Sequence, residues 1–293
     1  MAIVLSGGLL VAAAVVGAWL SRRRNRARFE DNSALPVGPS GILRGAESIA
    51  LDAGPRAVLI LHGFGDTPQS VRFLAEFLHQ NGWTVRAPLL HGHGGSLRDF
   101  AAASGAQWLA DARAELDRLM SRSHRVAIVG QSMGGALATV LAREARLDAM
   151  VLLAPYMRLS KRAARIAALH RVMSLLVPYL PSRSEYSILD PEARRAALGR
   201  GVTTPRLLHE LARIAEQARA ALPLIRIPTL VIHSRQDPRI SVVSATEAFS
   251  VLGSPTKVLE WAERSGHVLT ADFDREWIAG RVLHWLTLYV PRE

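Results

Sequence analysis

The sequence predicts an α/β fold, in which a mostly parallel sheet carries helices on both faces and a helical insertion interrupts the pattern. Short apolar runs that suit buried strands alternate with longer segments of helical periodicity from about residue 46 onward. Strands and helices that alternate in this way form parallel sheets covered on both sides. The alternation stops over residues 156–226 and resumes at residue 229. We therefore predict a core of residues 46–155 and 227–293 and a helical cap of residues 156–226.

The predicted strands are short apolar runs between turn residues. AVLILHG, AMVLLAP and TLVIHS are apolar at successive positions, as expected for strands buried on both faces of a parallel sheet. RVAIVG and KVLEW are shorter runs of the same kind, and TVRAPLL reads as a strand followed by a turn. In chain order the strands are predicted at 57–63, 84–90, 125–130, 149–155, 229–234 and 257–261.

The segments between these strands have the periodicity of amphipathic helices. In residues 68–82, for example, Leu74, Ala75 and Leu78 recur on one face, and Gly82 is placed to end the helix. Two further helices interrupt the alternation and form the predicted cap. The core helices are predicted at 68–82, 106–120, 132–145, 243–252 and 272–289, and the cap helices at 161–177 and 205–222.

The N-terminal segment is uniformly apolar and is followed by a basic cluster. Residues 2–20 carry no charged side chain, and a helix of that length spans about 28 Å, close to the thickness of a bilayer core. Residues 22–28 then hold five arginines. This pattern predicts an uncleaved transmembrane anchor at residues 1–28, with the arginines and the following domain on the cytoplasmic side. A cleaved signal peptide, which needs a basic region before the apolar run, or a buried helix are the alternatives.

The composition narrows the chemistry. The 293 residues include no cysteine, which excludes disulfides, cysteine-bound metal and a thiol nucleophile. The net charge of +11 is local: residues 22–28 contribute +5 and residues 156–226 contribute +8 (13 basic, 5 acidic), so the remainder sums to −2. Because no nucleic-acid-binding motif accompanies this charge, we predict no nucleic-acid partner.

Residues 29–45 are polar and rich in proline and glycine, which is typical of a linker.

The strongest motif is a G-x-S-x-G pentapeptide between a predicted strand and a predicted helix. It runs from Gly130 to Gly134 and has Ser132 at its centre. A serine on such a tight strand-to-helix turn exposes its hydroxyl, and the helix N-terminus points N–H groups at developing negative charge. The alternative is a structural turn that carries a serine. We predict that Ser132 is a nucleophile.

Three segments carry a resemblance to a known family. GQSMGG, LHGFGDTP at 61–68 and PLLHGHG at 88–94 resemble the corresponding segments of bacterial carboxylesterases and monoacylglycerol lipases of the α/β-hydrolase superfamily. The resemblance extends from about residue 55 to the C-terminus. It implies that the N–H group of Phe64, after the His-Gly pair, is one donor of the oxyanion hole. The other donor is expected to be the residue after the nucleophile, Met133.

The acid and the base are predicted from the order of the chain. In this fold the nucleophile is followed by the acid and then by histidine. Asp237 comes just after the strand TLVIHS, and His267 comes just after the last predicted strand. In the resembling esterases the acid and the histidine occupy these same two loops. Of the other nine histidines, His62 is expected to be structural, and His91 and His93 are expected to line the site or to be structural. The remaining six lie on predicted helices, in a turn or at the end of a strand, and the four on helices are expected to be surface or packing residues.

These residues predict a serine esterase that acts on carboxylic esters through an acyl-enzyme, without metal or organic cofactor. The basic cap is either an ordinary packed helical layer or a lid over an acyl pocket, and the second reading favours a lipid ester such as a monoacylglycerol. An acyltransferase, a C–C hydrolase or a peptidase can use the same triad, and a catalytically silent scaffold is a further alternative. The oligomeric state is not predicted by the sequence.

Overall fold

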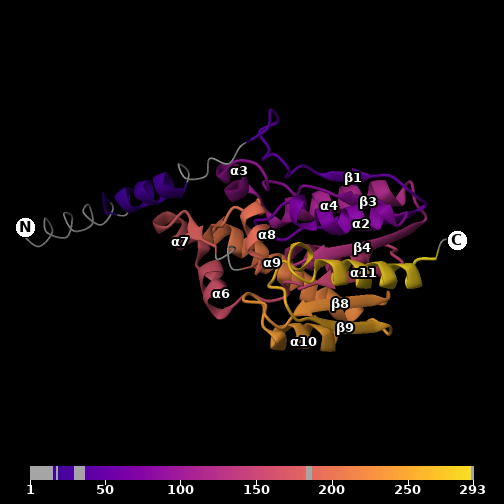
Figure 1. The fold of residues 1–293 in the computed structure, drawn as a ribbon. Helices are drawn as coiled ribbons and strands as arrows, with labels where there is room; N and C mark the ends of the chain where they lie inside the picture. The colour runs from indigo at the N-terminus through magenta and orange to yellow at the C-terminus, as the bar shows by residue number, and fades with distance from the viewer. Residues whose placement is uncertain (1–15, 18, 30–36, 183–186, 292–293) are drawn as a thin grey trace, which may run out of the picture.

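A seven-stranded sheet forms the centre of the computed structural model, which describes residues 16–17, 19–29, 37–182 and 187–291. The strand order is β1-β3-β2-β4-β5-β8-β9 (Figure 1). All neighbouring strands pair in parallel except β1, which runs antiparallel to β3 at one edge. The strands are β1 Ile49–Leu51, β2 Arg56–Leu61, β3 Thr84–Ala87, β4 Arg125–Gln131, β5 Ala149–Leu153, β8 Thr229–Ser234 and β9 Lys257–Ala262.

Helices cover both faces of this sheet. Along β2, the side chains of Val58 and Ile60 pack on one face and those of Leu59 and Leu61 on the other, as the two-residue period of a strand requires. The first face packs against α2 and α11, and the second against α4, α5 and α9. The predicted α/β fold is therefore confirmed. The core helices are α2 Arg72–Gln80, α3 Leu97–Ala102, α4 Gly105–Met120, α5 Met133–Glu144, α10 Val242–Val251 and α11 Arg275–Tyr289.

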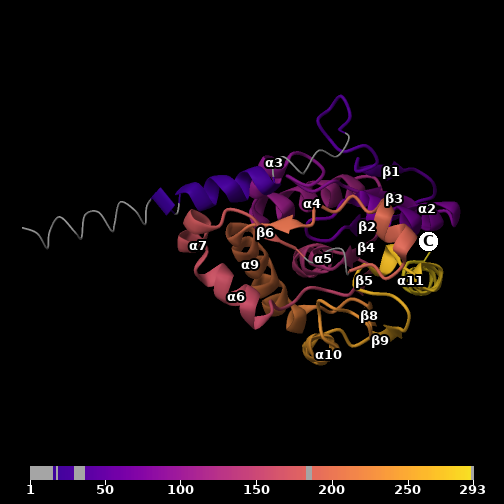
Figure 2. The same cartoon turned by 60° about the vertical axis from the view of Figure 1, so that its left-hand side comes forward.

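Between β5 and β8 the described chain is mainly helical. It contains α6 Lys161–Ala168, α7 His170–Leu176, α8 Pro191–Ala196 and α9 Pro205–Ala221, with a small hairpin of β6 Leu180–Pro181 and β7 Val202–Thr203. Of these elements, α6, α7 and α9 lie together on one side of the molecule (Figure 2). The predicted helix 161–177 is two helices, because the chain leaves helical geometry at Leu169. The inner face of α9 is buried against α5, so this helix belongs to the packed core.

The prediction of a transmembrane helix is wrong for the part of the chain that the structure describes. No helix there is both long enough and apolar enough to cross a bilayer. Residues 19–29 are helical, but they carry all five arginines of the basic cluster, and arginine is costly inside a bilayer. Residues 1–15 and 18, which hold most of the apolar run, lie outside the described residues. The predictions of a single-pass membrane location and of a membrane partner through this helix are withdrawn with it.

Instead, the helix of residues 19–29 contacts the cap. The Asn25 side chain donates to the carbonyl oxygen of Tyr179 at 3.2 Å and accepts from its N–H at 3.0 Å. The rings of Phe29 and Tyr179 lie 6.1 Å apart. Figure 2 shows this helix beside the end of the molecule that carries α7. The described part of the predicted linker is also anchored, because Leu43 is buried and its N–H donates to the carbonyl oxygen of Gly94.

Candidate active site

Ser132 stands at the turn between β4 and α5. It has φ 54° and ψ −115°, a backbone conformation that non-glycine residues rarely adopt. A side chain at Gly130 would come within 2.3 Å of the carbonyl oxygen of Gly134, and one at Gly134 within 2.1 Å of the carbonyl oxygen of Leu61. The G-x-S-x-G pattern is thus required by backbone packing around the turn, which places the Ser132 hydroxyl at the carboxyl end of the sheet.

The structure brings Ser132, His267 and Asp237 together. Ser132 Oγ lies 2.7 Å from His267 Nε2, and His267 Nδ1 lies 2.7 Å from Asp237 Oδ2. Both Ser132 and His267 are buried. With Asp237 ionised, the consistent assignment is that the Nδ1 proton of His267 is donated to Asp237 while Nε2 accepts from the serine hydroxyl. In this arrangement the imidazole can take the serine proton, and the carboxylate fixes its tautomer.

The loop after β8 prepares Asp237 for this role. Its side chain is fully buried, and Oδ1 accepts from the N–H groups of Arg239 at 2.7 Å and Ile240 at 3.0 Å. Burial alone would raise the pKa of this carboxyl. The nearby His267 and the two N–H donors outweigh burial and bring the pKa below its ordinary value. Asp237 is therefore ionised at neutral pH and can accept the Nδ1 proton of His267.

The predicted oxyanion loop lies directly beside Ser132. A Cβ atom at Gly63 would be 3.4 Å from the Cβ of Ser132, so the loop of residues 62–65 passes close to the serine in space. The ring of Phe64 packs against Phe100 at 5.3 Å and Trp108 at 5.7 Å between centroids. Met133 is the first residue of α5, where N–H groups have no acceptor within the helix. The two predicted donors thus come from segments that flank Ser132.

Two buried histidines stabilise this loop: His62, predicted to be structural, and His93, predicted to line the site or to be structural. His62 Nε2 accepts from the N–H of Leu90, and His93 Nε2 accepts from the N–H of Gly65. The Nδ1 atoms face carbonyl oxygens and donate to them. Burial lowers the pKa of His62 to about 4 and that of His93 well below its ordinary value. Both rings are therefore neutral at pH 7 and connect the loops 62–65 and 90–93.

Two contacts of the site were not foreseen from the sequence. Gln131, immediately before Ser132, donates from Nε2 to the carbonyl oxygen of His267 at 2.9 Å. Asp272, expected only at the start of the last helix, accepts hydrogen bonds from the N–H of Gly266, next to His267, and from that of Leu189, in the segment between β5 and β8. The motif flags Gln131 only as a variable position. The contacts of Asp272 join segments 82 and 83 residues apart, a separation that no local pattern reports.

Comparison with known proteins agrees with this fold and site. Residues 54–274 match the family model of the serine aminopeptidases, S33. The thermostable monoacylglycerol lipase of Bacillus sp. strain H-257 is 31% identical over 247 residues, which are 83% of this chain and 95% of that protein. The carboxylesterase of Bacillus subtilis strain 168 is 26% identical over 235 residues, covering 80% of this chain and 93% of that protein.

A solved structure of a lipolytic enzyme is also similar to this chain. The structure reported for the metagenome-derived lipolytic enzymes LipS and LipT superposes with a TM-score of 0.77 at 32% sequence identity. The match covers 84% of this chain and 98% of that structure's chain. The family match leaves out the N-terminal helix. The chain therefore belongs to the serine aminopeptidase S33 family of α/β-hydrolases, as an enzyme of the lipase and carboxylesterase type.

Proposed function

We propose that this protein hydrolyses carboxylic esters, with Ser132 as nucleophile, His267 as general base and acid, and Asp237 as the residue that orients the imidazole. The observation that carries the proposal is the unbroken chain of two 2.7 Å contacts from Ser132 Oγ through His267 to Asp237. A buried serine that contacts a histidine, which in turn contacts a carboxylate, is the arrangement that activates a hydroxyl nucleophile.

The reaction proceeds in two half-reactions. Ser132 Oγ gives its proton to His267 Nε2 and attacks the ester carbonyl carbon, and the N–H groups of Phe64 and Met133 stabilise the oxyanion. The C–O bond to the alcohol then breaks, and the leaving alkoxide takes the proton from His267. A water molecule next gives a proton to His267 and attacks the acyl-enzyme. The carboxylic acid leaves, and the proton returns to Ser132.

The substrate class that we propose is a lipid ester of the monoacylglycerol type. The support is the 31% identity to a monoacylglycerol lipase over 95% of that protein's length, together with the likeness to lipolytic enzymes. The half-buried Phe64 ring, which packs on Phe100, is an apolar group next to the predicted oxyanion donor and suits contact with an acyl chain. p-Nitrophenyl and glycerol esters of graded acyl length would define the preferred chain.

The central test is the Ser132→Ala chain, compared with wild type for ester hydrolysis and for labelling by a fluorophosphonate probe. We expect the variant to lose at least about a thousandfold in kcat and to take up no probe, while its circular dichroism spectrum stays unchanged. Near-wild-type hydrolysis by the variant would refute the proposal. If labelling is normal in wild type but acyl groups pass to an added alcohol in preference to water, the chain is an acyltransferase with the same triad.

A further inference from the structure

A short segment of the cap lies directly against the loop that carries His267. We call residues 187–190 the return segment and residues 264–268 the histidine loop. The carbonyl oxygen of Ser187 accepts from the N–H groups of His267 at 2.8 Å and Val268 at 3.0 Å. The cap is thus hydrogen-bonded to the backbone of the histidine itself.

The side chain of Asp272 joins the same two segments. Oδ2 accepts from the N–H groups of Leu189 and Gly266, both at 2.7 Å, and Oδ1 accepts from that of Asp190 at 2.9 Å. The Phe273 N–H adds a fourth hydrogen bond at 2.9 Å. This carboxylate is 1% exposed, and among the described side chains no cation pairs with it. Backbone N–H groups from the cap and from the histidine loop therefore stabilise its buried charge together.

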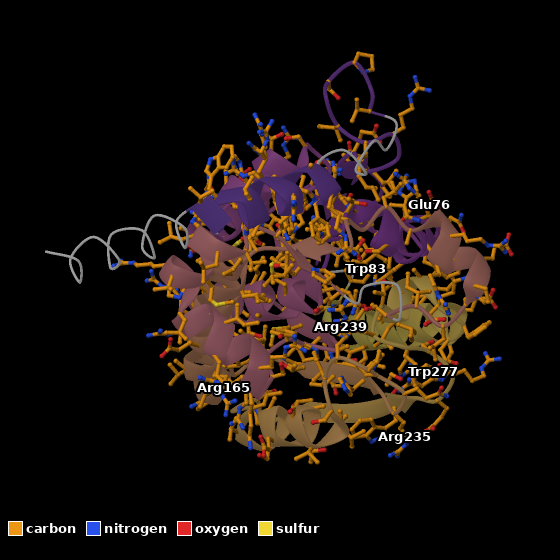
Figure 3. The ribbon with its side chains drawn as sticks, turned by 90° about the vertical axis from the view of Figure 1, so that its left-hand side faces the viewer. Glu76, Trp83, Arg165, Arg235, Arg239 and Trp277 are labelled. Carbon is orange, nitrogen blue, oxygen red and sulfur yellow. The ribbon has the colours of Figure 1, made fainter. Side chains whose placement is uncertain are left out.

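The close fit between the two segments depends on Gly266. A Cβ atom at this position would lie 2.7 Å from the carbonyl oxygen of Ser187, closer than side chains approach backbone atoms. On the other side of the cap segment, Arg239 donates from Nε to Ser187 Oγ at 2.7 Å. Figure 3 shows Arg239 in the middle of this face, well inside the rim where Arg165 and Arg235 lie. The return segment is therefore fastened to the loops of both His267 and Asp237.

The histidine is also fixed from the nucleophile strand, where Gln131 donates to its carbonyl oxygen. Its backbone is thus bonded through the N–H to the cap and through the carbonyl to β4. A displacement of the return segment would break the hydrogen bond from the His267 N–H and keep the one to the His267 carbonyl oxygen. The histidine loop would therefore tilt. Misplacing a reacting group by about 1 Å can cost on the order of a hundredfold in rate.

We propose that Asp272 is a positioning residue, which couples seating of the return segment of the cap to the orientation of His267. The proposal rests on the assignment of His267 as the base. Its consequence is that ester hydrolysis depends on the cap even for small esters that make few contacts with it. A cap that only encloses an acyl chain would affect KM and chain-length preference instead.

The test compares Asp272→Asn with Asp274→Asn, using a short p-nitrophenyl ester and the full-length chain. Asp274 is a matched control, because its carboxylate also braces the histidine loop, through the N–H groups of Arg264 and Ser265, but none of its recorded contacts reaches the cap. An amide at position 272 offers one acceptor oxygen and turns an NH₂ group toward backbone donors. We expect Asp272→Asn to lower kcat by about 10- to 100-fold with KM nearly unchanged, and Asp274→Asn by less than about threefold.

A pH profile separates positioning from a loss of folded protein. In Asp272→Asn a tilted imidazole loses part of its contact with Asp237, so the acid limb of kcat/KM should move to lower pH. A fall in the folded fraction would lower the rate without moving the limb. Equal kcat losses in the two variants, or an unmoved limb, would overturn the proposal.

A second variant decides the case if Asp272→Asn does not fold. Gly266→Ala keeps the carboxylate but pushes the Ser187 carbonyl away from the loop, so it should lower kcat and move the limb in the same direction. A folded Gly266→Ala chain with wild-type kcat would overturn the proposal. Ser132→Ala is measured in parallel: if it remains active, the proposed function fails, whereas an inactive Ser132→Ala beside an unaffected Asp272→Asn removes only the present inference.

Discussion

Ser132 adopts a backbone conformation that its surroundings have to enforce. Left-handed backbone at a non-glycine residue costs on the order of 1–3 kcal/mol. Two hydrogen bonds oppose this cost: the Ser132 N–H donates to the carbonyl oxygen of Leu153 at 2.9 Å, and the Ser132 carbonyl oxygen accepts from Tyr156 at 3.0 Å. Both partners belong to β5 and the residues after it. The neighbouring strand therefore helps to hold the hydroxyl toward His267.

The same scale decides which carboxylate orients the histidine. Asp237→Asn should reduce kcat by about a thousandfold or more, because an amide can donate to His267 Nδ1 and favours the wrong tautomer. Steady-state kinetics with a short ester would measure this loss, with the melting temperature recorded to establish that the variant is folded. A larger loss in Asp272→Asn than in Asp237→Asn would mean that the acid has been misassigned.

At the level of elements, glycines in helices differ according to what lies beside them. In the first turn of α5, an alanine at Gly134 would put its Cβ 2.1 Å from the Leu61 carbonyl oxygen. At Gly280 in α11, apart from the nearby backbone of the helix itself, no atom of the described residues would lie within 4 Å of that Cβ. We expect Gly134→Ala to destabilise the chain by about 3 kcal/mol, and Gly280→Ala to stabilise it by about 0.5–1 kcal/mol through helix propensity. Urea unfolding of both variants would measure the two free energies, and effects of the same sign would contradict this account.

The sequence was informative about elements wherever a pattern was long or chemically specific. The six predicted strands exist with ends shifted by a few residues, because short apolar runs between turn residues are typical of strands in a covered parallel sheet. The edge strand β1 was missed because three residues carry no periodicity. The break at Leu169 was missed because the apolar pattern continues across it. The N-terminal run was predicted to span a membrane from its length and its lack of charge. The contact that the adjoining helix makes instead, between Asn25 and Tyr179, joins residues 154 positions apart, which no local pattern indicates.

The residues of the candidate site could be predicted from the sequence, because the chain order of nucleophile, acid and histidine leaves few candidates for each position. The structure places Ser132, Asp237 and His267 in contact, and their roles remain the prediction that the variants above test. The hydrogen bonds between the cap and the histidine loop could not be predicted from the sequence. They are made by backbone atoms and by a single carboxylate, and their geometry depends on how two distant loops meet.

The whole molecule carries buried neutral histidines whose protonation opposes folding. Burial lowers the pKa of His62 from 6.5 to about 4, so between these values the unfolded chain binds a proton that the folded chain does not. Stability is therefore lost as the pH falls through this window, at about 1.4 kcal/mol per pH unit for each such group. Asp66 acts in the opposite direction, because burial raises the pKa of its carboxyl to about 6 and the folded chain takes up the proton first.

A variant isolates one of these groups. His62→Gln keeps an acceptor for the Leu90 N–H but cannot be protonated. We expect it to be less stable than wild type at pH 7. Between pH 6.5 and 4, however, its free energy of unfolding should fall less steeply than that of wild type, and the two slopes should differ by about 1.4 kcal/mol per pH unit. Urea unfolding at several pH values would give both curves, in which Asp66 contributes equally. Parallel curves would show that His62 is not held neutral by the fold.

The strand order has a consequence for how the chain is made. Synthesis proceeds from the N-terminus, and the strands that flank Ser132 are all complete by residue 153. Asp237 follows β8 and His267 follows β9, so both reach the sheet only when its final strands are added beside β5. Helix α11, which covers the face shared with α2, follows both of them in the chain. A nascent chain therefore displays Ser132 long before His267 is made, and the contact between the two side chains can form only after β9 has been added.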